Sequence, residues 1–519
     1  MVEHKKSPGH LLALAYLGLV VLATLAAYSD SFGVPFVIDD VPSIARNTSI
    51  RGLPHLSEWW SPPAASTVSG RPILNASFAI NYCISGYEVW SYHLFNLAIH
   101  FGCGALIFLI VCSTLRRIHG AAGPDPILTA AIASGLWLVH PLQTEAVTYL
   151  VQRAESLSTL FYLASFYGFI RYIDGRPWGA VASIVLLIAG VLTKEIVATA
   201  PVLFLLYDYA FVTGSVKRAV EKHWRYYACS LSSWIAIAAT VLVTRGRNGT
   251  VAFGTEIGPL DYALTETWAI LRYLELAVLP VGQIFPYEAA SVTSMGVIAP
   301  CLVAVATLLA FSVYLVVRRP RIGFLLCGFF IILAPTSSFI PIVTETVAEH
   351  RMYLPLGICT TIAALLLIRL PLWATGAVST TILIFLAGAT FARNRVYASP
   401  MSILADAESK QPNAADFANY YALELVGAGD LRDAEAMLRH SISVHPTTQL
   451  PWRIWRTFFG REGRLPRRTA CTPWPWLRSP PRRRVFSTSA SPCERRATCR
   501  MRKLPCGGQL ASNPIFRKP

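Results

Sequence analysis

Two adjacent carboxylates, Asp39 and Asp40, are the side chains in this sequence that are best placed for chemistry. They follow the first apolar segment, residues 11–28, and stand at the start of a polar, aromatic-rich loop that we expect to span residues 29–91. If the apolar segment crosses a bilayer, both acids lie at the membrane–water boundary, where partial burial raises the pKa of a carboxyl group. Such a carboxylate can act as a general base towards a hydroxyl group. The alternative is that the pair caps an interfacial helix or marks the membrane edge.

Other charged and imidazole side chains occur in a few short stretches that could serve the same chemistry. Transfer of a sugar from a lipid phosphate needs a cation beside the departing phosphate and a carboxylate that takes the proton of the acceptor. We predict that the donor phosphate is bound by Arg153, Arg351, His350 and Lys194. We predict roles in acceptor binding or structural support for Arg71, His93, His140, Glu145, Glu155 and Glu349. The alternatives are headgroup-level anchoring for each arginine and interhelical hydrogen bonds for His100 and His140.

The composition indicates that these residues are carried by a polytopic membrane protein. Of the 519 residues, 54% are hydrophobic and only 14% are charged, whereas about a quarter of a soluble domain is charged. We expect an all-α bundle with about 11 spans, at residues 11–28, 92–114, 127–143, 157–173, 178–193, 196–213, 225–244, 296–317, 322–341, 353–369 and 371–391. The stretch 264–281 contains Glu266, Arg272 and Glu275, so we expect an interfacial or re-entrant helix there.

Basic residues fall in every connection on one side of this arrangement, as the positive-inside rule requires. The amino terminus is therefore predicted to be cytoplasmic and the carboxyl-terminal region to lie outside. Most of the unusual charged residues then collect at the outer face, whereas a transporter would more often bury them near the midplane. This distribution favours interfacial chemistry over transport, with a non-enzymatic membrane scaffold or a transporter as the alternative.

The sequence gives little support for metal or nucleic-acid binding. Its 11 cysteines lack metal-ligand spacing, and two adjacent acids alone make a poor cation site. No metal site is predicted, and dependence on a divalent ion stays open. Residues 451–519 hold 17 of the 45 Lys and Arg and 2 of the 29 Asp and Glu, so nearly all of the net charge of +16 belongs to this tail. We therefore predict no nucleic-acid partner for the membrane domain.

The chain divides into three parts. Residues 1–391 form the predicted membrane domain, and residues 392–450 form a linker with a single helix–turn–helix of the tetratricopeptide type. About three such repeats are needed to bury their apolar faces, so we interpret this single repeat as a truncated array. Residues 451–519 show no periodicity, and we interpret them as disordered and as the product of a reading-frame shift near residue 450. A basic arm that binds anionic lipid or nucleic acid is the alternative.

Several of these motifs together resemble one protein family over about residues 10–450. It comprises the transmembrane and tetratricopeptide-repeat-containing protein O-mannosyltransferases with their bacterial relatives. The matching motifs are Ile38-Asp39-Asp40, Arg71-Pro72, Tyr92-His93-Leu94-Phe95-Asn96 with His100, His140-Pro141-Leu142 with Thr144-Glu145-Ala146-Val147, Arg153 with Glu155, Lys194-Glu195, and Ala348-Glu349-His350-Arg351 with Tyr353-Leu354-Pro355. The sequence departs from the family in its repeats, because it has one where the family has many.

The resemblance implies a glycosyltransferase C fold and a specific reaction. In this family a polyprenyl- or dolichyl-phosphate sugar, usually mannose, is transferred to Ser or Thr of a protein on the non-cytoplasmic side. By motif, Asp39 and Asp40 match the acidic catalytic pair, and Arg153 and Arg351 match the basic residues near the donor phosphate. We expect an inverting transferase. A lipid or polysaccharide acceptor, or another sugar, is the alternative within this fold. The compact loops favour a bacterial cell membrane, with the endoplasmic reticulum membrane as the alternative, and the oligomeric state stays open.

Overall fold

The structure is a computed structural model that describes residues 8–51, 58, 62–63, 66–119, 125–243, 258–287, 294–339, 346–412, 414–444, 451 and 454–455. Within these residues every regular element is a helix, as the apolar segments predict. The predicted tail 451–519 lies outside the described residues, apart from positions 451, 454 and 455, so its disorder and the frame shift remain predictions.

The helices follow the predicted apolar segments closely. The longer helices of the membrane domain are α1 (Pro8–Ala27), α3 (Pro72–Ser85), α4 (Trp90–His119), α5 (Pro126–Leu138), α7 (Arg153–Ile173), α8 (Trp178–Val191), α9 (Ala200–Asp208), α10 (Val216–Ser230), α11 (Ser232–Val243), α13 (Pro259–Val278), α14 (Met295–Arg318), α15 (Pro320–Leu333), α16 (Leu356–Leu367) and α17 (Leu372–Asn394). Short helical turns fill several connections, among them η4 (Pro141–Gln143), α6 (Thr144–Thr148) and η8 (Glu349–Met352).

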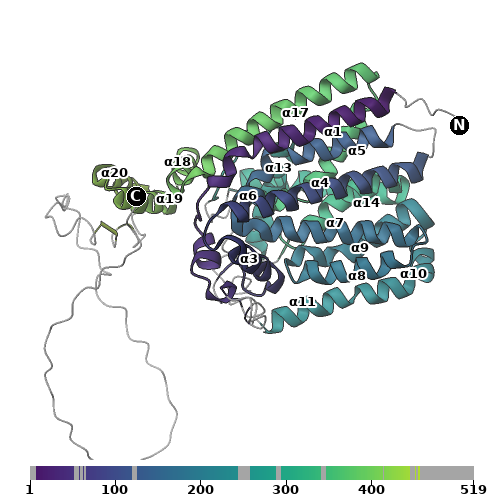
Figure 1. Cartoon of the computed structure of the whole chain (residues 1–519), viewed down its shortest axis with the longest axis horizontal. Helices are drawn as coiled ribbons and strands as arrows, with labels where there is room; N and C mark the ends of the chain where they lie inside the picture. Colours follow the sequence, from purple (N-terminus) through teal and green to yellow (C-terminus); the bar gives the residue numbers. More distant parts are fainter. Residues whose placement is uncertain are drawn as a thin grey trace, which may run out of the picture. The chain divides into compact units, whose positions relative to one another are not determined.

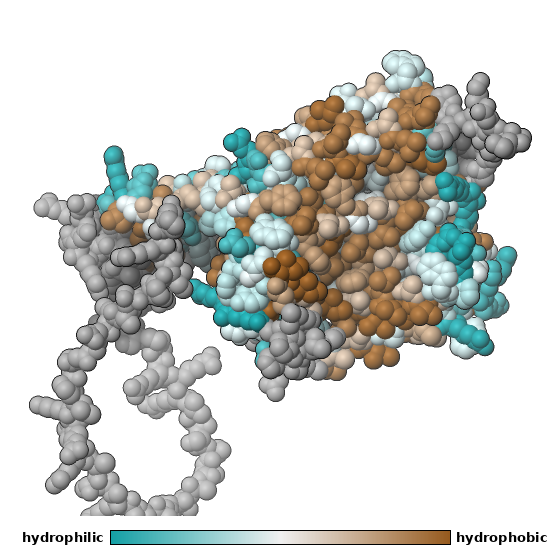
Figure 2. Space-filling model, in the orientation of Figure 1, coloured by the Kyte–Doolittle hydropathy of each residue, from teal (hydrophilic) through white to brown (hydrophobic). Residues whose placement is uncertain are grey.

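The chain is a multi-pass membrane protein by the length and composition of these helices. In the described residues, five helical stretches are long and apolar enough to cross a bilayer, and a bent pair makes a sixth. A band of hydrophobic residues covers the middle of the visible face, and hydrophilic residues gather towards its two ends (Figure 2). Helices α8, α15 and α16 are apolar but shorter than a full crossing. The predicted count of 11 spans is therefore not confirmed.

Small residues allow close contacts between helices of the bundle. Helices α7 and α8 pack along most of their length, and α1 lies beside α17 (Figure 1). A Cβ atom added at Gly179 of α8 would stand 2.5 Å from the carbonyl oxygen of Gly168 in α7. The two backbones can approach this closely only because both positions are glycine.

The segment 127–143 differs from the prediction because the helix breaks there. Helix α5 ends at Leu138, and the chain continues through η4 into α6 at an angle of 57°. Pro141 lacks a backbone N–H group and cannot continue the hydrogen bonds of α5. The break directs residues 140–155, which carry four predicted site residues, to one end of the bundle.

The described residues of the carboxyl-terminal region include the helices α18 (Pro400–Lys410), α19 (Ala415–Ala428) and α20 (Leu431–Val444). Helices α19 and α20 pack against each other across Gly429, whose φ of 86° ends α19 in the left-handed conformation that glycine favours. The predicted helix–turn–helix is therefore present, while its assignment as a tetratricopeptide repeat stays a prediction.

Candidate active site at one end of the bundle

The two adjacent acids have different surroundings. Asp40 is fully buried, and its carboxyl oxygens accept hydrogen bonds from the backbone N–H of Val37 at 3.0 Å and of Val151 at 2.7 Å. Burial raises the pKa of Asp40 to about 8, against the opposing effect of the two N–H donors. Because both oxygens are used inside the protein, Asp40 joins the first loop to the turn before α7.

Asp39 is only partly buried and faces a hydroxyl group. Its Oδ2 atom lies 3.5 Å from Oγ1 of Thr67, while its backbone N–H donates to the Tyr149 hydroxyl at 2.9 Å. Burial raises the pKa of Asp39, and the Thr67 hydrogen bond opposes the rise. The preceding residue, Ile38, has a φ of 44°. This conformation is strained for a β-branched residue, and such strain is often found at functional sites.

A series of contacts leads from Asp39 to the cationic side chains. Thr67 also accepts a hydrogen bond at its carbonyl oxygen from Arg71 Nη1, at 3.1 Å. The Nη2 atom of Arg71 lies 3.4 Å from both carboxylate oxygens of Glu195. Glu195 follows Lys194 in the chain, so the loop of the acids and the turn before α9 meet at this end of the bundle.

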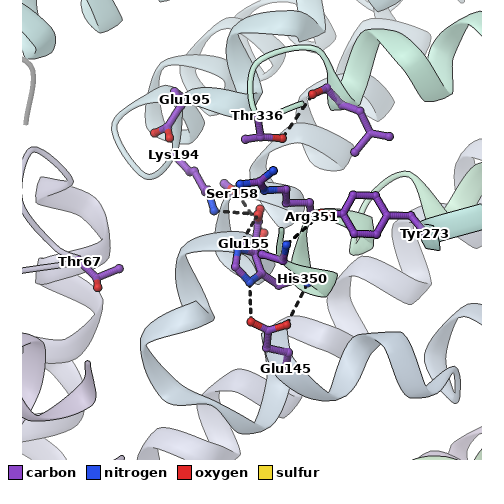
Figure 3. Close-up of polar contacts among 12 residues, drawn as sticks. Thr67, Glu145, Glu155, Ser158, Lys194, Glu195, Tyr273, Thr336, His350 and Arg351 are labelled. Carbon is purple, nitrogen blue, oxygen red and sulfur yellow. Dashed lines mark hydrogen bonds and ion pairs between the residues drawn. The ribbon is translucent and has the colours of Figure 1, made fainter. Parts of the chain in front are cut away.

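Lys194 belongs to a buried network of four charged or titratable side chains (Figure 3). Its Nζ atom lies 2.7 Å from Oε1 of Glu155, and the same oxygen lies 3.9 Å from Nε2 of His350. The Nδ1 atom of His350 lies 2.6 Å from Oε1 of Glu145. Residues from three distant parts of the sequence therefore form one network.

Arg351 is also buried at this end but is paired with a residue outside the predicted site. Its Nη1 donates to Glu266 at 2.8 Å and to the Thr346 carbonyl at 3.1 Å. Glu266 lies in α13, the helix that we predict to be interfacial because of its charges. One of these charges therefore neutralises Arg351.

The guanidinium group of Arg153 donates hydrogen bonds to several oxygens of the protein. Its donors reach Asn96 and Asn81 at 2.6 Å each, the Ser77 carbonyl at 3.2 Å and the Tyr92 carbonyl at 3.0 Å. The guanidinium also lies 4.5 Å from the centre of the Phe78 ring. This geometry joins α3, α4 and α7 and places Arg153 in a structural role here, so phosphate binding by Arg153 stays a prediction without geometric support.

Three further predicted residues make local structural contacts. His93 bonds through Nε2 to the Val34 carbonyl at 2.9 Å, which ties α4 to the first loop. His140 accepts from the Leu142 N–H at 3.2 Å and lies 3.3 Å from the Ala277 carbonyl. The carboxylate of Glu349 accepts three hydrogen bonds, from Gln283, Ile284 and Tyr287. Their roles in acceptor binding or structural support stay predictions.

Thr67, Tyr149 and Glu266 are the residues that the sequence did not single out for the site. Thr67 and Tyr149 contact Asp39 from positions 28 and 110 residues away, and no motif or spacing indicates such pairs. The charge of Glu266 inside an apolar stretch was a usable signal, but its partner Arg351 was not predictable from spacing.

The described residues contain no group of three or more His, Cys, Asp or Glu side chains arranged to hold a metal ion. Fold and site together thus define a class, namely an all-helical, multi-pass membrane protein with a cluster of acids and cations at one end of its bundle.

Comparison with known proteins finds relatives that match parts of the chain. The chain is 32% identical over 208 residues to protein O-mannosyl-transferase Tmtc1 of Drosophila melanogaster, which covers 38% of this chain and 23% of the relative. It is 34% identical over 194 residues to human protein O-mannosyl-transferase TMTC3, covering 35% of this chain and 20% of the relative. A third relative, protein O-mannosyl-transferase F38B6.6 of Caenorhabditis elegans, is 23% identical over 466 residues, covering 85% of this chain and 64% of the relative.

The curated homologues of this chain are therefore protein O-mannosyl-transferases of the TMTC family, which confirms the resemblance drawn from the motifs. The matches span less than two thirds of the length of these relatives. No family model and no solved structure matches the chain.

Proposed function

We propose that this protein transfers a sugar, mannose by analogy with its homologues, from a polyprenyl or dolichyl phosphate to Ser or Thr of a protein. The names of the homologues support sugar transfer to protein. The observation that carries the proposal is the meeting of a partly exposed acid, Asp39, with buried cations at one end of the bundle.

Asp39 is proposed as the general base, and Asp40 as the residue that holds the loop. The Asp39 carboxylate takes the proton of the acceptor hydroxyl while the acceptor oxygen attacks the anomeric carbon of the sugar. The bond from that carbon to the phosphate oxygen breaks, and the lipid phosphate leaves with its negative charge. Attack from the side opposite the phosphate inverts the anomeric centre, so the product and the donor differ in configuration.

Arg71 and Lys194 are proposed to stabilise the departing phosphate. Arg71 is connected to Asp39 through Thr67, and its 3.4 Å contacts with Glu195 are longer than those of a tight charged pair. Lys194 follows at the adjacent turn, where its ammonium group neutralises Glu155. Arg351 is paired with Glu266, and His350 is paired with Glu145. We propose that these buried pairs influence the electrostatic potential at the phosphate site without contacting the phosphate.

We propose that this end of the bundle faces the non-cytoplasmic side, in agreement with the basic connections predicted at the other end. A bacterial cell membrane stays the favoured location, with the endoplasmic reticulum as the alternative. The protein is proposed to act without nucleic acid and without a cofactor other than the lipid-linked donor.

The test is a transfer assay with the full chain in membranes. Labelled polyprenyl-phosphate mannose should label a Ser/Thr-rich protein acceptor, and labelled nucleotide mannose alone should not. Arg71→Gln should raise the KM for the lipid donor about tenfold through loss of a charge-assisted hydrogen bond. Arg51→Gln changes an exposed arginine of the same loop and should leave KM unchanged.

Label found only in lipid or polysaccharide would redirect the proposal to another acceptor. Absence of transfer with every donor and acceptor, from a protein that is folded in the membrane, would instead favour the non-enzymatic scaffold.

A further inference from the structure

An apolar cavity lies inside the membrane domain, away from the site described above. It has a volume of about 310 Å³ and is lined by side chains of α4, α7, α9, α15 and α16. Most of the lining is aliphatic or aromatic, for example Val111, Phe166, Leu203 and Leu365. Two of its polar groups, the hydroxyls of Thr114 and Tyr207, lie 2.9 Å apart and bond to each other. The interior of the cavity therefore suits a hydrocarbon chain, because a water molecule would find few free hydrogen-bond partners there.

A single charged side chain, Arg321, lines this cavity. Arg321 is the second residue of α15 and is exposed. It makes no hydrogen bond or ion pair with any residue of the part that the structure describes. Arg318, the last residue of α14, and Arg319, in the turn before α15, add further positive charge. An anion at this end would thus meet an available guanidinium.

The charged end of the cavity is far from Asp39. Asn96, which bonds Arg153, lies near the start of α4, whereas Ile118 of the same helix lines the cavity. The two residues are 22 positions apart, which corresponds to about 33 Å of helix. In Figure 1, α4 runs from the end of the bundle that holds α3 and α6 towards the end that holds α10. Arg321 therefore belongs to the end opposite the candidate active site.

We propose that the cavity binds an acyl chain of an anionic glycerophospholipid whose phosphate is held by Arg321. A phosphate oxygen accepts charge-assisted hydrogen bonds from a guanidinium with good geometry. The lipid comes from the leaflet at the α10 end, where basic juxtamembrane side chains attract anionic headgroups. This inference is independent of the proposed sugar transfer.

The competing occupant is the isoprenoid tail of the sugar donor, entering from the other end. Leu354 lines the cavity and lies three residues after Arg351. Arg351, however, already pairs with Glu266 at 2.8 Å, whereas Arg321 has no such partner in the described residues. Charge complementarity therefore favours a headgroup at Arg321.

The test uses the purified full chain in a neutral detergent and photoreactive lipids. Phosphatidylglycerol and phosphatidylcholine, each with a diazirine at the end of one acyl chain, are cross-linked and mapped by mass spectrometry. We expect phosphatidylglycerol to label the cavity-lining parts of α15 and α16 about tenfold more than phosphatidylcholine, since the charged headgroup selects it. Arg321→Gln should abolish this preference, and Arg319→Gln, in the same turn, should retain it.

A second pair of variants tests the cavity itself. Leu325→Trp fills the cavity and should remove labelling, whereas Leu366→Trp changes an exposed position of α16 and should not. Should Leu325→Trp fail to fold, the exposed Arg321 variant still decides the question. Equal labelling by both lipids would overturn the proposal. The proposal would also be overturned if Arg321→Gln left the labelling unchanged and polyprenyl phosphate displaced the labelled lipid. The latter result would assign the cavity to the donor tail.

Discussion

At the scale of single residues, the neighbouring carboxyl groups of Asp39 and Asp40 have different surroundings, and we propose different roles for them. Both carboxyl oxygens of Asp40 accept hydrogen bonds from backbone N–H groups. One carboxyl oxygen of Asp39 accepts a hydrogen bond from Thr67, and Asp39 remains partly accessible. Sequence alone could place the pair at the membrane edge but could not divide the roles. The division depends on Val151 and Thr67, which lie far from the pair in the chain.

Arg153 provides the clearest test of structural against catalytic roles. Arg153→Met should lower the free energy of unfolding by about 3–5 kcal/mol, because it leaves buried oxygens of Asn81 and Asn96 without their donor. Arg153→Lys should recover only part of this, since an ammonium group cannot reach all of the acceptors. Thermal unfolding in detergent measures the loss. A stable Arg153→Met protein with a raised KM for the donor would instead support phosphate binding.

The raised pKa of Asp40 predicts a pH-dependent contribution to stability. Its pKa is about 8 in the folded protein against 3.8 ordinarily, so the folded state retains a proton that the unfolded state releases. The contribution is fully present below about pH 4 and is lost as the pH rises towards 8. The difference in Tm between the wild type and Asp40→Asn, which cannot titrate, should therefore shrink from pH 4.5 to 8.5. A difference that grows with pH would mean that the N–H donors of Val37 and Val151 outweigh burial.

At the scale of helices, the length of the apolar stretches predicted well which segments are helical, but it predicted poorly where those helices are interrupted. The apolar segments from residue 11 to 391 correspond to observed helices, because each stretch is long and carries few charges. The break after α5 and the division of 225–244 between α10 and α11 depend on local geometry. Pro141 was a visible signal for the first of these, whereas the position of the second had none.

The contact of α7 with α8 makes a prediction at this scale. Gly179→Ala should destabilise the protein by about 1–3 kcal/mol, because the new Cβ would meet the backbone of α7 at 2.5 Å. Gly388→Ala in α17 is the control, since its Cβ would meet nothing within 4 Å. It should be neutral or stabilising, because alanine favours helix more than glycine by about 1 kcal/mol. Equal effects of the two variants in thermal unfolding would contradict the close packing of α7 and α8.

At the scale of the whole molecule, the proposed function requires that the two ends of the bundle face opposite sides of the membrane. The hydrophobic band between hydrophilic ends in Figure 2 agrees with this requirement. Glu88, in the turn between α3 and α4, and Lys217 of α10 are both exposed and charged. Cysteine at Glu88 should react with an impermeant maleimide only from the non-cytoplasmic side, and cysteine at Lys217 only from the cytoplasmic side. Labelling of both from one side would contradict the topology.

The most direct measurement compares Asp39→Asn with Asp40→Asn in the transfer of mannose from polyprenyl phosphate to a protein acceptor. We expect Asp39→Asn to abolish transfer while leaving Tm within a degree or two of the wild type, which follows from its partial exposure. Asp40→Asn should lower Tm by several degrees, because its amide cannot accept both backbone hydrogen bonds, yet the folded fraction should retain transfer. Full transfer by Asp39→Asn, or loss of transfer by a stably folded Asp40→Asn alone, would contradict the account.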